Sequence, residues 1–172
     1  NKYMCLGGTR KVIERLIQVS ALVFIDSEDT IICDSTWLSH SQYGGGYKVV
    51  HDKKNAPLDK CTKMHIACLK NSKIIAFAKA TRGTVHDCPI FKELVMSVFR
   101  NGFTINSLLA DAGYLSKNNY RLCDNLNIGK VFIDFKSNSK LNENSKTPWN
   151  IRLTMFVKDK DLWHEKYRYR VV

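Results

Sequence analysis

The first third of the chain shows a helical pattern of apolar residues, then an extended one, then a polar stretch. Apolar side chains at positions 12, 13, 16, 17 and 19 predict a helix over residues 9–22, with Thr9 as its N-cap. The β-branched stretch 30–37 (TIICDSTW) predicts a buried strand that ends in Asp34. Residues 39–60 are rich in glycine and charged side chains, which predicts a loop.

A hairpin and a second helix are predicted next. Residues 61–69 (CTKMHIACL) and 74–80 (IIAFAKA) have the composition of two strands, joined by a tight Asn-Ser turn. Residues 85–102 predict a helix with Pro89 in its first turn and Gly102 at its end. Its apolar stripe, expected to face the core, consists of Ile90, Leu94, Val95 and Val98.

The last part of the chain alternates between strands and helices. Residues 107–114 (SLLADAGY) contain a short buried strand that ends in Asp111. The remaining predictions are a helix over 116–129, a strand over 130–135, a polar loop over 136–150 and a last helix over 159–172. A hairpin followed by alternating helices and strands predicts an α/β fold, a mixed sheet flanked by helices.

Two aspartates are candidates for chemistry because each ends a short apolar strand. In open α/β sheets, ligands bind at the carboxyl ends of the strands. Two carboxylates held close together repel each other, and Mg²⁺ or Mn²⁺, which prefer oxygen ligands, relieves that repulsion. Asp34 and Asp111 could therefore carry two-metal phosphoryl transfer. The alternative is that both carboxylates only cap the turns that follow them.

Charge and cysteine content narrow the partner and the compartment. The chain has 27 Lys and Arg against 16 Asp and Glu, a net charge of +11, which favours nucleic acid as the partner. The alternative is an organism whose proteins are generally basic and rich in lysine. Six scattered cysteines without a Cys-x-x-Cys pair indicate a reducing, intracellular compartment. Cys61 and Cys68 lie on opposite sides of their predicted strand, so a zinc site there is disfavoured. No apolar run is long enough to cross a bilayer.

Several stretches, in this order, carry a family resemblance. They are residues 31–39 (IICDSTWLS), residues 63–95 with Lys-x-His and His-Asp pairs, and residues 108–123 with Ala-Asp-x-Gly-Tyr. Together they resemble the DDE transposases of bacterial and archaeal insertion sequences. Their catalytic core has an RNase H-like (retroviral integrase-like) fold, and the likeness extends over residues 20–172.

The resemblance implies a role for each matching residue. Asp34 and Asp111 would be the first two catalytic carboxylates and metal ligands, and His86 and Asp87 would belong to a supporting segment. Tyr167 and Arg170 match the start of the family's closing Tyr-Arg-Glu-Lys signature, near the DNA or bracing the last helix. The signature's glutamate is then expected two positions after Val172, with Glu165 as a poorer substitute because it precedes the Tyr-Arg pair.

The resemblance also implies the domains, reaction and partners. Residues 1–25 are expected to be a helical lead that ends a missing N-terminal region, and residues 26–172 a catalytic core incomplete at its C-terminus. The implied activity is cleavage and transfer of DNA strands at insertion-sequence ends with Mg²⁺ or Mn²⁺, and the 172 residues alone would be inactive without the third acid. Double-stranded DNA, a homodimer or higher oligomer, and a cytoplasmic, nucleoid-associated location are expected. A decayed or domesticated DNA-binding relative and a nuclease on the same fold remain the alternatives.

Overall fold

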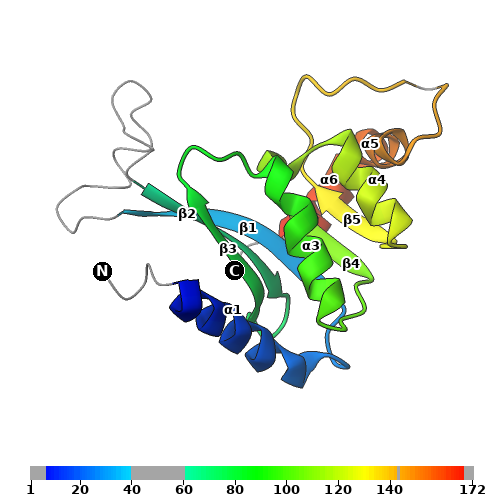
Figure 1. Ribbon diagram of the computed structural model, residues 1–172. Coiled ribbons are helices and arrows are strands. Elements are labelled where there is room, and N and C mark those ends of the chain that lie inside the picture. The colour runs from blue at the N-terminus through cyan, green and yellow to red at the C-terminus, as the bar shows by residue number, and fades with distance from the viewer. Residues whose placement is uncertain (1–6, 40–60, 143, 169–172) are drawn as a thin grey trace.

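The computed structural model describes residues 7–39, 61–142 and 144–168, which form a mixed five-stranded sheet with helices packed against it (Figure 1). The strand order is β3-β2-β1-β4-β5. Strands β1 (Thr30–Ser39), β2 (Cys61–Leu69) and β3 (Ile75–Arg82) pair antiparallel, whereas β4 (Ser107–Ala110) and β5 (Lys130–Ile133) continue the sheet in parallel. This architecture confirms the expected α/β, RNase H-like class.

Helices lie on both faces of the sheet. They are α1 (Gly7–Ala21), α3 (Phe91–Arg100), α4 (Lys117–Asn125), α5 (Pro148–Lys158) and α6 (Lys160–Arg168), with 3-10 turns η1 (Leu22–Phe24), η3 (Cys88–Ile90) and η4 (Ala112–Tyr114). Figure 1 shows α1 and α3 in front of the sheet and α6 behind it. Within the described residues, no helix has both the length and the apolarity to span a membrane.

The core lies mainly between α3 and the sheet. The side chains of Phe91, Leu94, Val95 and Val98 are completely buried there, so the predicted stripe is confirmed from Leu94 onward. Ile90 is only partly buried because it lies in η3, one residue before α3 begins. Full burial of such side chains contributes about 1.5–3 kcal/mol each, and the helix is therefore held firmly against the strands that carry the site.

Strand β1 is longer than predicted, and Asp34 does not end it. Its antiparallel pairing with β2 continues to the Ser39–Cys61 pair. Its parallel pairing with β4, in contrast, stops at Cys33 and Ala110. Asp34 is therefore the first residue of β1 beyond its parallel neighbour. The prediction that the strand ends at Asp34 was therefore wrong. The pairing with β4 does end there, but the pairing with β2 on the other side of β1 continues.

Helix α5 was missed, since residues 148–150 were assigned to a loop and residues 151–158 were given no helix. Thr147 caps α5 by accepting a hydrogen bond from the amide of Asn150 at 3.3 Å, and Pro148 occupies the first turn. A capping threonine followed by proline is a standard helix start, so this signal was present in the sequence. The predicted glycine-rich loop falls almost entirely on residues 40–60, outside the described residues.

Candidate active site

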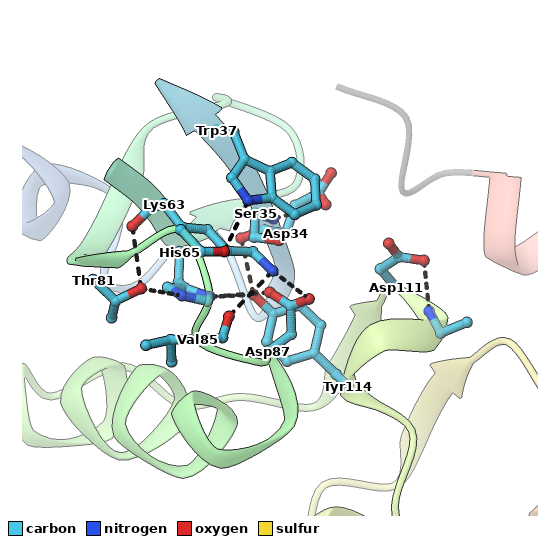
Figure 2. Close-up of polar contacts among 12 residues, drawn as sticks. Asp34, Ser35, Trp37, Lys63, His65, Thr81, Val85, Asp87, Asp111 and Tyr114 are labelled. Carbon is cyan, nitrogen blue, oxygen red and sulfur yellow. Dashed lines mark hydrogen bonds and ion pairs between the residues drawn. The ribbon is translucent and has the colours of Figure 1, made fainter. Parts of the chain in front are cut away.

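The sheet brings Asp34 and Asp111 to the same edge. Strands β1 and β4 are neighbours and run parallel, and the last pair between them is Cys33 with Ala110. Asp34 is the next residue of β1, and Asp111 is the first residue after β4 (Figure 2). Both are partly buried. Neighbouring strands lie about 4.8 Å apart, so two residues at equivalent positions can share a ligand.

Both carboxylates are oriented by the backbone. The amide of Ser35 donates to Asp34 Oδ1 at 2.8 Å, and the amide of Ala112 donates to Asp111 Oδ1 at 2.6 Å. Asp111 is thus the N-cap of η4, as the capping alternative required. Capping does not exclude metal binding, because a carboxylate has a second oxygen and further acceptor sites.

The donor chemistry of this edge suits a divalent cation with hard oxygen ligands, such as Mg²⁺ or Mn²⁺. Asp34 and Asp111 are the residues that would hold it. Among the described residues, no set of three or more His, Cys, Asp or Glu side chains is arranged to hold a metal ion. Asp134 follows β5 at the position next to Asp111, but it does not complete such a set. Sequence reasoning had missed this third Asp, although VFID repeats the apolar-then-acid pattern of IICD and LLAD.

The other predicted site residues lie elsewhere. Glu165 is exposed on α6 and pairs with Lys166 at 2.9 Å, so within the described residues it does not join the two aspartates. Tyr167 is partly buried and packs against the main hydrophobic core. Arg170 lies outside the described residues. The roles proposed for Tyr167 and Arg170 at the DNA remain predictions.

A buried polar network lies beside Asp34 (Figure 2). Its ion pair joins Lys63 Nζ to Asp87 Oδ2 at 2.9 Å, and the side chains are 4% and 16% exposed. His65 is fully buried, with Nδ1 at 3.1 Å from Asp87 Oδ1 and Nε2 at 3.0 Å from Thr81 Oγ1. The hydroxyl of Tyr114 donates to the backbone carbonyl of Asp34 at 3.0 Å.

Trp37 and Gly113 border this network. Trp37 Nε1 donates to the Gly83 carbonyl at 3.1 Å, and its ring lies 4.4 Å from Lys63 Nζ, so that it covers the ammonium group. A Cβ on Gly113 would lie 2.8 Å from Asp87 Oδ2. Only glycine therefore allows the η4 turn to approach Asp87 this closely, which explains the glycine of Ala-Asp-x-Gly-Tyr.

Of the His-Asp pair that was predicted to support the site, only Asp87 joins this network within the described residues. His86 is exposed, and none of the hydrogen bonds or ion pairs found among the described residues includes it. Asp87 instead contacts both Lys63 and His65. The available signals were the Lys-x-His and Asp-x-Gly-Tyr strings, which were recognised without a role for Lys63, His65 or Tyr114.

Burial controls the protonation of the network. It lowers the pKa of His65 below the usual 6.5, against an opposing effect of Asp87, while Lys63 lowers it further. A neutral His65 with its proton on Nδ1 faces the Asp87 carboxylate and accepts from Thr81 through Nε2. Burial also raises the pKa of Tyr114 far above its usual value, so its hydroxyl stays protonated as a donor.

The lowered pKa of His65 predicts acid sensitivity of the fold. Below pH 6.5 the unfolded chain takes up a proton at this side chain more readily than the folded one. The free energy of unfolding is therefore expected to fall as the pH drops below 6.5. Urea unfolding at neutral pH and at about pH 5 measures this. His65→Gln should flatten the dependence and His86→Gln should leave it unchanged; an equal effect of the two substitutions would contradict the prediction.

Comparison with known proteins identifies the part of the chain that carries this site. The family model described as "Transposase DDE domain" matches residues 25–172, which include Asp34, Asp111 and the whole buried network. Comparison with curated proteins gave no match.

Proposed function

Because the chain belongs to the family of transposase DDE domains, we propose that it cleaves DNA strands at the ends of an insertion sequence and joins them to target DNA. The observation that carries this proposal is the position of Asp34 and Asp111 at one edge of two neighbouring parallel strands. A transposase domain needs a place where a phosphodiester, a nucleophile and divalent metal can meet. That edge offers two backbone-oriented carboxylates for the purpose.

The proposed reaction is attack at phosphorus. Water first attacks a phosphodiester at the element's end, and the 3′-oxygen leaves as a free hydroxyl. This hydroxyl then attacks a phosphodiester of the target strand, whose own 3′-oxygen leaves, so that the element's 3′-end is joined to the target's 5′-phosphate. Bound Mg²⁺ or Mn²⁺ would activate the attacking oxygen and stabilise the leaving oxygen. The protein itself would hold the reacting groups in line, with Asp34 and Asp111 in fixed rotamers.

The partner in this proposal is double-stranded DNA, both at the element's ends and at the target. The net charge of +11 supports phosphate contacts by lysine and arginine, with an affinity that decreases steeply as salt is added. A homodimer or larger assembly on DNA and a nucleoid-associated location in the cytoplasm complete the proposal.

The test uses the protein expressed from its complete reading frame and linear DNA that carries the coding sequence with its natural flanks. With Mg²⁺ or Mn²⁺ we expect breaks with free 3′-hydroxyls at defined flanking positions, followed by joined products, and neither with a chelator.

The same assay separates the alternatives. Cleavage without joining would favour a nuclease on this fold. DNA binding without cleavage under any metal would favour a non-catalytic relative, and either result would overturn the proposed strand transfer.

A further inference from the structure

We propose that Tyr114 is a positioning residue that fixes Asp34 relative to Asp111. This inference rests on the proposed function, because it concerns the geometry of the two carboxylates that the reaction would use. Tyr114 would not touch DNA or metal. It would act through the backbone of β1.

The strand pairing leaves the segments that carry Asp34 and Asp111 without a direct hydrogen-bonded connection. The parallel ladder between β1 and β4 ends at Cys33 and Ala110, one residue before each aspartate. The hydrogen bonds of the sheet therefore do not continue between the two segments that present the carboxylates. Metal ligands must nevertheless be held to within about 0.5 Å for productive geometry.

Tyr114 connects the two segments with one backbone and one side-chain hydrogen bond. It follows Asp111 by three residues, and its amide donates to the Asp111 carbonyl at 2.9 Å, which closes the η4 turn. Its hydroxyl donates to the Asp34 carbonyl at 3.0 Å. The aspartate after β4 and the aspartate of β1 are thereby joined through a single rigid ring.

The buried network in turn holds the ring. Tyr114 is fully buried, and its ring centroid lies 5.8 Å from that of Phe91 on α3. His65 Nδ1 lies 3.5 Å from the hydroxyl and 3.1 Å from Asp87 Oδ1. The Nδ1–H of His65 faces the Asp87 carboxylate, the shorter of these two contacts, and the His65 ring thereby borders the hydroxyl that donates to Asp34.

A second buried tyrosine, Tyr120, serves as a control for the purely structural effect of losing a buried hydroxyl. Tyr120 on α4 is also fully buried, and its hydroxyl donates to the carbonyl of Ile133 on β5 at 3.2 Å. The two tyrosines thus make the same kind of bond to the same sheet. They differ in the strand that they hold, and only Tyr114 holds a residue of the candidate metal site.

The experiment compares Tyr114→Phe with Tyr120→Phe in the protein from the complete reading frame. Mn²⁺ affinity is measured by electron paramagnetic resonance without DNA, beside urea unfolding and DNA binding. Both variants should lose similar stability and retain DNA binding. Only Tyr114→Phe should weaken Mn²⁺ binding, by about 10- to 100-fold, as is typical when a residue supporting a metal ligand is removed.

Several results would overturn the inference. If Mn²⁺ affinity is unchanged in Tyr114→Phe, or falls equally in Tyr120→Phe, Tyr114 is only a core residue. The proposed function would still be supported in that case by metal-dependent cleavage with the wild type. A wild type that neither binds Mn²⁺ nor cleaves DNA would refute both the positioning role of Tyr114 and the proposed function. If Tyr114→Phe does not fold, His65→Ala, whose side chain has no polar atom to contact the hydroxyl, should weaken Mn²⁺ binding in its place, and unchanged affinity there also refutes the link.

Discussion

Asp34→Asn and Asp111→Asn are each expected to lower DNA-strand cleavage by at least about a thousandfold, which is the upper range for loss of one preorganised electrostatic group. The amide keeps the shape of the side chain and can still accept the hydrogen bond from the next backbone amide. It removes the negative charge that would hold a divalent cation. The effect is therefore expected on chemistry, with the fold retained.

DNA binding distinguishes this effect from general damage. Both variants should bind the flanking DNA as tightly as the wild type, because phosphate contacts depend on basic residues. Asp29→Asn is a matched control, since Asp29 lies before β1 at the opposite edge and accepts a hydrogen bond from Asn106 at 2.9 Å. The Asp29→Asn variant should cleave DNA at the wild-type rate. Full cleavage by Asp34→Asn or Asp111→Asn would refute the assignment of the active site.

Asp87→Ala is expected to have the largest effect on stability, about 3–5 kcal/mol, because it leaves a buried charge without its partner. The Lys63 ammonium would keep only the Val85 carbonyl at 3.5 Å and the Trp37 ring nearby. The loss would be read from urea unfolding at neutral pH. Adding Lys63→Met to Asp87→Ala should recover part of it, since an apolar pair avoids the uncompensated charge.

A second lysine-acid pair in the same chain controls for burial. Lys79 and Glu93 lie 2.7 Å apart, but their side chains are 28% and 42% exposed. Glu93→Ala should cost less than about 1 kcal/mol, as is usual for solvent-screened pairs. Similar losses in Asp87→Ala and Glu93→Ala would show that burial of the Lys63 pair does not matter for stability.

The elements that could be predicted are those determined by interactions between residues close together in the sequence. The hairpin of β2 and β3 follows from two β-rich stretches and a tight turn, and the start of α4 from the Ser116 cap, which accepts from the Asn119 amide at 3.0 Å. Adjacent residues in a turn have no such periodicity. This is why the inward Asp87 could not be told from the outward His86.

The α/β class, most elements and the two candidate aspartates could be predicted from the sequence, because apolar periodicity, capping residues and the family resemblance are all read along the chain. That Asp34 continues β1 rather than ending it depends on the sheet, since the pairing with β2 extends further than the pairing with β4. The assembly of Lys63, His65, Asp87 and Tyr114 into one buried network likewise depends on the folded chain. These residues come from three separate segments, and their contacts depend on burial and strand order, which no local pattern specifies.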